Sequence, residues 1–145
     1  MILFFFIVAT RNHFKEIKSE EKIKMNRENI NTIIGACLAA SITWYINHTM
    51  GYGPIVANGL VGVLVSILFS PELSGSYYLS SFIGMSGIAI VPSMVSAGIT
   101  GIVAGIVIIF SKEIYGGMGG KGGTIAALST QIIRGTLYFL LKKVG

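Results

Sequence analysis

The most constraining feature of this sequence is the scarcity of charge between residues 30 and 141. Only five side chains in this stretch carry a formal charge, namely Glu72, Lys112, Glu113, Lys121 and Arg134. Soluble domains usually contain about 25% charged residues, whereas this chain contains 12% charged and 52% hydrophobic residues. An ion at the centre of a bilayer costs about 2.5–3.5 kcal/mol on insertion scales. The sequence therefore predicts an integral membrane protein.

The apolar stretch divides into five candidate helices. A crossing helix needs about 20 mostly apolar residues, and turn residues or proline separate such segments here. The charge-free run 77–111 would reach about 52 Å as one helix, so we expect a break at Pro92. The segments are expected at 30–50, 54–70, 78–91, 93–111 and 124–141. The predicted fold class is all-α, an integral membrane bundle of four to five short helices.

Two topologies for these segments stay open. The positive-inside rule places basic flanks in the cytoplasm, but five full crossings would put Lys142 and Lys143 on the side opposite the basic N-terminal flank. Four crossings with a re-entrant segment at 78–91 would bring both ends to the cytoplasm. Residues 65–73 also resemble residues 106–114, which predicts two repeated helix pairs, with coincidence between apolar stretches as the alternative.

Residues 1–28 form a charged N-terminal arm ahead of a membrane domain at 29–145. Six of the eleven lysines and arginines lie between Arg11 and Arg27. One interpretation is an amphipathic helix on the cytoplasmic leaflet. The other is that translation starts at Met25. The basic flank predicts a multi-pass protein of the cell inner membrane with a cytoplasmic N-terminus, and it does not indicate nucleic-acid binding because no exposed aromatics or known fold accompany it.

Arg134 is the most costly residue of the predicted membrane domain. Arginine in lipid must pair, line water or reach the headgroups. We expect Arg134 and Gln131, which lies one turn earlier, to line a polar path, with Glu72 or Glu113 as the acidic partner. The alternative is that the fifth segment is short or interfacial, so that the guanidinium reaches the headgroups.

The glycine-rich run 116–123 is the second candidate site. A glycine loop that opens a helix presents free N–H groups to an anion, and Lys121 would add positive charge. Gly119 and Gly122 are the candidate anion contacts within this run. Neither the dinucleotide fingerprint nor the P-loop fits, because no βαβ unit is expected and Lys121 is followed by glycine. A flexible connector between helices is the alternative.

The remaining candidates indicate packing, not chemistry. Ala97, Gly101 and Gly105 recur at spacing four, a pattern that predicts close helix packing or self-association. Cys37 is the single cysteine, and His48 has no acidic or thiol neighbour in sequence. Because no catalytic or metal-ligand constellation is present, we expect neither an enzyme nor a metal or cofactor site.

Two classes of function are compatible with these features. The first is a small channel or transporter for a small solute or ion. The second is a non-transporting membrane assembly or scaffold subunit, or a holin-like pore former. A chain of 145 residues rarely encloses a pathway alone, so we expect a homo-oligomer in the lipid bilayer with no nucleic-acid partner.

Overall fold

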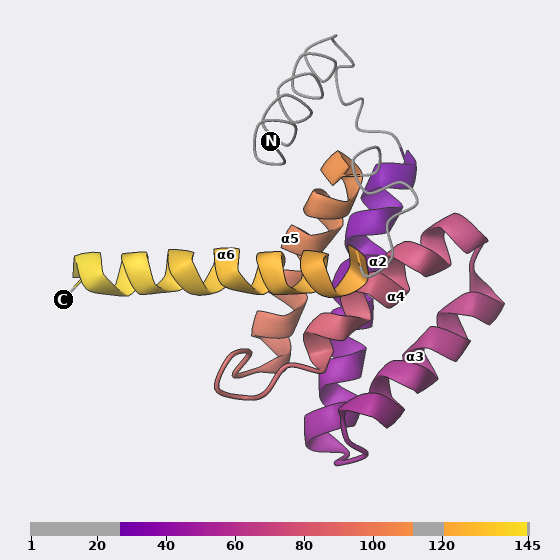
Figure 1. Ribbon diagram of the computed structural model, residues 1–145, viewed down its shortest axis with the longest axis horizontal. Coiled ribbons are helices and arrows are strands. Elements are labelled where there is room, and N and C mark those ends of the chain that lie inside the picture. Colours follow the sequence, from indigo (N-terminus) through magenta and orange to yellow (C-terminus); the bar gives the residue numbers. More distant parts are fainter. Residues whose placement is uncertain (1–26, 112–120, 145) are drawn as a thin grey trace, which may run out of the picture.

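The computed structural model describes residues 27–111 and 121–144, with side chains described through residue 136 except that of Lys121. These residues form five α-helices and no strand (Figure 1). The helices are α2 (Arg27–Trp44), α3 (Pro54–Leu68), α4 (Pro71–Gly84), α5 (Met94–Ser111) and α6 (Lys121–Val144). A π-helical turn, η1 (Tyr45–Thr49), extends α2. The all-α prediction is confirmed for the described part of the chain.

The third helix differs from its prediction. The sequence predicts it at 78–91, but α4 begins at Pro71 and ends at Gly84. Pro71 both follows α3 and occupies the first turn of α4, where its missing N–H is not needed. Glu72 in the same turn suits the positive end of the helix dipole. Residues 85–93, called the break segment below, are not helical, so the break starts well before Pro92.

Local signals explain where α3 and α5 begin. Gly51 and Gly53 have φ values of 74° and 83°, a region that favours glycine, and they turn the chain from η1 into Pro54 at the start of α3. Before α5, the Ser93 backbone N–H donates to Ser96 Oγ at 3.0 Å, and the Ser96 N–H donates to Ser93 Oγ at 3.1 Å. This reciprocal capping satisfies two N–H groups that a helix start otherwise leaves unpaired.

The small-residue face of α5 lies against α2. An ideal Cβ on Gly101 would be 2.7 Å from the Ala36 carbonyl oxygen, and one on Gly105 would be 2.8 Å from Ile33 Cα. Ala97 is fully buried in the same core. Because the end of α5 meets the start of α2, the two helices are antiparallel, and their backbones approach closely where side chains would not fit.

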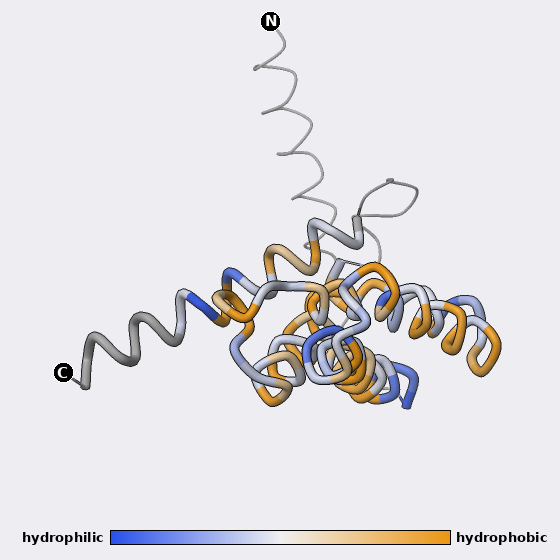
Figure 2. Tube along the Cα trace, turned by 90° about the horizontal axis from the view of Figure 1, so that it is seen from below, coloured by the Kyte–Doolittle hydropathy of each residue, from blue (hydrophilic) through white to orange (hydrophobic). Residues whose placement is uncertain are grey.

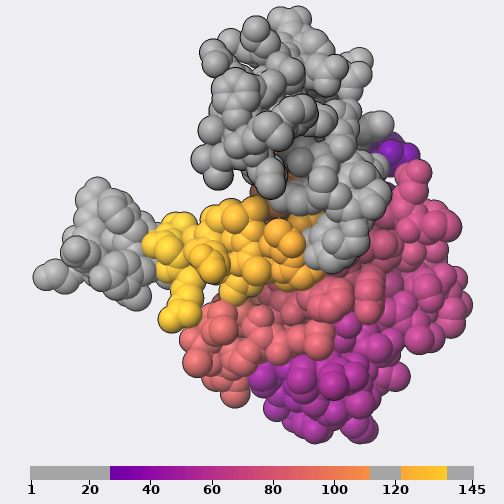
Figure 3. All heavy atoms as spheres, viewed as in Figure 1, coloured from indigo at the N-terminus to yellow at the C-terminus, as the bar shows by residue number. Residues whose placement is uncertain are grey.

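The other helices are arranged around this pair. α4 also packs on α2, α3 packs on α4, and α6 packs on both α4 and α5. Figure 1 shows α6 crossing α5 at a steep angle, with its later turns extending beyond the other helices, and Figure 2 shows the arrangement from below. In the space-filling view of Figure 3, α6 lies across the face that α4 and the neighbouring segments form. The core joins α2, α4, α5 and α6, with a second cluster between α2, α3 and α4.

The core combines apolar side chains, such as fully buried Ile83, with many small and polar ones. Ten buried side chains in the described residues are polar, among them fully buried Thr43, Ser80 and Ser81. Most buried hydroxyls bond to the carbonyl four residues earlier in their own helix, as Thr43 does with Ala39 at 2.8 Å. Many other large aliphatic side chains point outwards, and Ile55 and Ile67 are 80% and 76% exposed. In Figure 2, orange apolar positions recur along the helices.

Two described stretches are long and apolar enough to cross a membrane, judged by length and composition. One is Arg27–Thr49, with 23 residues and a mean hydropathy of 1.2, and the other is Met94–Ser111, with 18 residues and a mean hydropathy of 2.2. Helix α3 is also apolar but has 15 residues.

Candidate functional site

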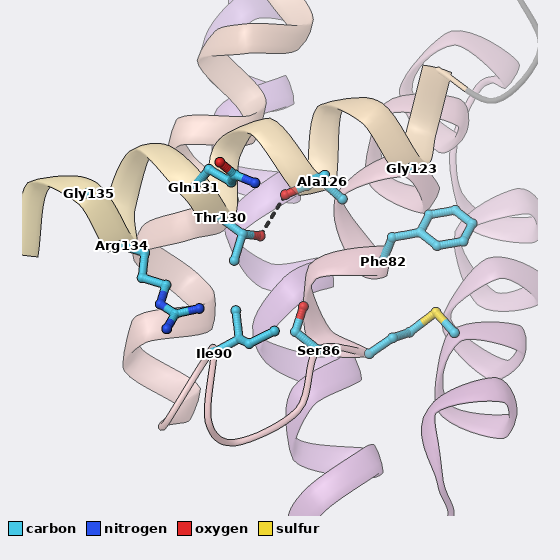
Figure 4. A pocket seen from close by; sticks show the side chains of 11 residues that line it. Phe82, Ser86, Ile90, Gly123, Ala126, Thr130, Gln131, Arg134 and Gly135 are labelled. Atoms are coloured by element: carbon cyan, nitrogen blue, oxygen red, sulfur yellow. Dashed lines mark hydrogen bonds between the residues drawn. The ribbon is translucent and has the colours of Figure 1, made fainter.

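An open groove of about 860 Å³ lies between the end of α4, the break segment and α6 (Figure 4). One wall consists of Phe82 from α4 together with Met85, Ser86 and Ile90 from the break segment. The opposite wall is α6, which contributes Gly123, Ala126, Ala127, Thr130, Gln131, Arg134 and Gly135. The groove therefore brings together the start of the glycine-rich helix, the break that precedes α5, and Arg134, which the sequence marks as separate features.

The lining of the groove changes character along α6. At one end, Phe82 lies near Gly123, and Ala126 and Ala127 continue this apolar floor. At the other end Gln131 and Arg134, on consecutive turns of α6, add polar groups, with Ile90 of the break segment opposite Arg134. The hydroxyl of Thr130, midway along, donates to the Ala126 carbonyl at 2.6 Å. The groove thus has a hydrocarbon-like end and a cationic end.

Arg134 is exposed and extends into the groove mouth. Figure 4 shows its guanidinium directed toward Ile90 and the break segment. Within the described residues it has no ion pair with Glu72, which lies exposed in the first turn of α4. Glu72 is ten residues before Phe82, or about 15 Å along the helix axis. The structure therefore does not bring Glu72 to Arg134, and Glu113 lies outside the described residues.

Three side chains at the end of α2 and in η1 hold the break-segment wall in place. Trp44 Nε1 donates to the Val91 carbonyl at 2.9 Å, and Asn47 Nδ2 donates to the Gly84 carbonyl at 3.0 Å. His48 Nε2 lies 2.9 Å from the Ser86 carbonyl oxygen, so this ring nitrogen is the donor. The π-helical turn directs these groups toward carbonyls that the break leaves without helical partners.

These three hydrogen bonds, called the clamp below, were not predicted from the sequence. Neither Trp44 nor Asn47 stands out in the sequence as a partner of the break segment. The only local signal was the spacing of Trp44 and His48, one turn apart, whose rings pack with centroids 4.9 Å apart. Because η1 and the break segment lie far apart in the sequence, only the tertiary structure shows that they are hydrogen-bonded to each other.

A second polar cluster joins α3 to α4. Buried Asn58 accepts a short hydrogen bond from Ser81 Oγ, and its Nδ2 atom donates to the Tyr78 hydroxyl at 3.4 Å. In the described residues no buried side-chain nitrogen or oxygen lacks a hydrogen-bond partner. Its buried groups are satisfied within the cluster, which therefore joins the two helices.

The glycine-rich candidates separate into different positions. Gly122 is buried, and an ideal Cβ there would be 2.5 Å from Leu79 Cδ2, so this glycine permits close contact between α6 and α4. Gly123 beside it is open and lines the groove. Lys121 begins α6, whereas Gly119 lies outside the described residues, as do the arm at 1–26 and the other glycines before Lys121.

No group of three His, Cys, Asp or Glu side chains that could hold a metal ion occurs in the described part of the chain. Comparison of the chain with protein-family models, with curated proteins and with solved structures finds no match. The groove between α4 and α6 is therefore interpreted from its own chemistry.

Proposed function

We propose that this chain is a multi-pass integral membrane protein. The many outward-pointing aliphatic side chains support this proposal, because a helix that is apolar on its outer faces needs an apolar solvent. In the described residues from 29 to 111, Glu72 is the single charged residue, and it lies at a helix start. The buried hydroxyls that bond within their own helices are also typical of membrane bundles. Location in the cell inner membrane, with a cytoplasmic N-terminus, stays a prediction.

We further propose that the groove binds an anionic solute and that the protein acts as a small carrier or channel for it. The observation that carries this proposal is the position of the Arg134 guanidinium, which projects into the groove beside the break segment. A guanidinium at membrane depth is costly unless it acquires a partner, and an anion held by charge-assisted hydrogen bonds meets this need. Gln131, on the preceding turn, also lines the groove.

The break segment provides the movable side of the proposed site. Irregular backbone at membrane depth is tolerated where it is buried in protein or lines a cavity, and transporters place their binding sites at such breaks. Here the break lines the groove through Ser86 and Ile90. Its carbonyls are held by three side chains of α2 and η1, so rearrangement of this clamp would open or close the groove.

A homo-oligomer is part of the proposal. The α2–α5 contact is filled by close approaches of glycine and alanine, so the described residues pack together around no through-going polar path. Meanwhile the later turns of α6 extend beyond the other helices (Figure 1). A second copy packed along α6 would cover this helix and complete a path beside the groove.

The second candidate function is a non-transporting assembly or scaffold subunit, with a holin-like pore former in the same class. The closely packed α2–α5 interior favours it, because such an interior is suited to a rigid anchor. Under this proposal α6 is an arm that docks another membrane protein, and Arg134 reaches the headgroup region without binding a solute.

Anion flux separates the two functions. Pure protein in liposomes is assayed for uptake of chloride, phosphate and short organic anions, with Arg134→Gln and Arg134→Lys as matched variants. We expect flux that falls at least tenfold in Arg134→Gln, the loss of a charge-assisted interaction of about 1.5 kcal/mol or more, and is largely kept in Arg134→Lys. Equal flux in empty liposomes and in those with wild-type protein, for every anion, would reject transport.

A further inference from the structure

We propose that the occupant of the groove between α4 and α6 is an anionic membrane lipid, with its headgroup at Arg134 and an acyl chain along the apolar end. This inference rests on the anion site at Arg134 that the proposed function also uses, and it names a lipid, in place of a small solute, as the anion bound there. It is carried by the order of polar and apolar groups along the groove, by the route through which a ligand reaches it, and by charge complementarity with Arg134.

The order of the lining matches a molecule with a separate head and tail. Gly123 and Ala127 present no side chain larger than a methyl group at the apolar end, so a hydrocarbon chain fits against the α6 backbone there. Phe82 closes this end opposite Gly123 (Figure 4). Arg134 lies eleven residues after Gly123, about 16 Å along α6. A compact inorganic anion would occupy only the Arg134 end and would leave the apolar floor empty.

The route into the groove also indicates a lipid. The groove is open along its side, and Ile90 on the break segment, which lines it, is 44% exposed. In a membrane this aliphatic surface faces acyl chains, because water does not solvate it favourably. A lipid would therefore enter the groove sideways from the bilayer.

The headgroup end has the chemistry that an anionic phosphodiester requires. Arginine binds phosphate oxygens through paired N–H donors in a planar fork, and it is less strongly hydrated than lysine. Arg134 is exposed and without an ion pair in the described residues, and Gln131 stands one turn away on the same wall. A zwitterionic headgroup also carries a phosphate, but its ammonium offsets the attraction to the guanidinium. The groove should therefore select lipids with net negative charge.

Lipid retention measured by native mass spectrometry tests the inference. The full chain is reconstituted in nanodiscs with equal amounts of phosphatidylglycerol and phosphatidylcholine, released, and the bound lipids are counted. Arg134→Gln removes the cation, and Gly123→Leu fills the apolar end, where an ideal Cβ meets no atom within 4 Å. Gly59→Leu is the matched control, because its Cβ is equally open but lies on α3, away from the groove.

We expect wild-type protein and Gly59→Leu to retain one phosphatidylglycerol at least tenfold over phosphatidylcholine. Arg134→Gln should lose this preference, and Gly123→Leu should lose the bound lipid. Equal retention of the two lipids by wild-type protein, or retention unchanged in both groove variants, would overturn the inference. If inorganic phosphate binds in an Arg134-dependent manner while no lipid is retained, the lipid inference fails and the anion site stands. If neither phosphate nor lipid responds to Arg134→Gln, the proposed anion site fails as well.

Discussion

Adding one methyl group at Gly101 tests the central packing of the bundle. In Gly101→Ala the new Cβ would lie 2.7 Å from the Ala36 carbonyl oxygen and 3.0 Å from both Ala40 Cβ and Cys37 Cα. Ordinary contacts begin at 3.4 Å, and two of these three neighbours are backbone atoms that cannot rotate away. Helices α2 and α5 must therefore separate. A gap of about 0.5–1 Å between the helices would remove a quarter to a half of the van der Waals attraction energy at each neighbouring contact.

The expected magnitude follows from comparing Gly101→Ala with Gly59→Ala. At Gly59 an ideal Cβ meets nothing within 4 Å, so alanine should stabilise the helix by about 1 kcal/mol through propensity alone. Gly101→Ala gains the same propensity but also incurs overpacking, which typically costs about 1–3 kcal/mol. The free energies of unfolding of the two variants should therefore differ by about 1–3 kcal/mol, with Gly101→Ala the less stable.

The assay is SDS-induced unfolding in mild detergent micelles, followed by circular dichroism on wild-type protein and both variants. Because both variants make the same chemical change in a helix, propensity and denatured-state effects cancel to first order in their difference. Equal stabilisation by the two substitutions would refute the close approach of α2 and α5 at this position. A loss at Gly59 as large as that at Gly101 would show that α3 has a neighbour that the monomer lacks.

Two further predictions address the clamp and the topology. Trp44→Phe removes the indole N–H that donates to the Val91 carbonyl in the break segment, so it should lower the free energy of unfolding by about 1–3 kcal/mol. The same SDS titration measures this loss. An unchanged unfolding midpoint would show that this hydrogen bond is not formed. The topology is tested by single cysteines that replace Tyr52, Ile88 or Glu28 on a Cys37→Ala background. In a membrane, the cysteines at positions 52 and 88 should react with an impermeant thiol reagent from the same side, because η1 contacts the break segment. The cysteine at position 28 should react from the opposite side, because it lies at the other end of α2. Labelling of Tyr52→Cys and Glu28→Cys from one side would exclude α2 as a crossing helix.

Most helix positions could be predicted from the sequence, but α4 begins at Pro71 and not at 78, and α6 begins at Lys121 and not at 124. Proline and glycine marked the ends of α3 and the start of α5 correctly, because these residues limit the backbone itself. The prediction for α4 was wrong because proline was interpreted only as a boundary after the second segment. Pro71 also suits the first turn of the following helix, α4. The chain then leaves the helix at Gly84, where the clamp from η1 supplies partners for the freed carbonyls.

The candidate site was only partly predictable. Arg134 and Gln131 were singled out because a cation and an amide are conspicuous in an apolar segment, and both line the groove. Sequence spacing could not show whether Glu72 pairs with Arg134. Glu72 lies at the end of α4 that is far from Arg134, and only the direction of α4 in the structure shows this. Trp44, Asn47 and His48 were missed because their partners are backbone carbonyls, which carry no signature in the sequence.

The sequence by itself predicted the helices of the described residues and the small-residue face of α5, because the scarcity of charge and the spacing of breakers and small residues are properties of the residues themselves. The tertiary structure decided which small residues touch, that Gly122 packs while Gly123 lines a groove, and that Arg134 meets the break segment. These outcomes depend on which helix faces approach one another across long distances in the sequence, and local patterns do not encode that.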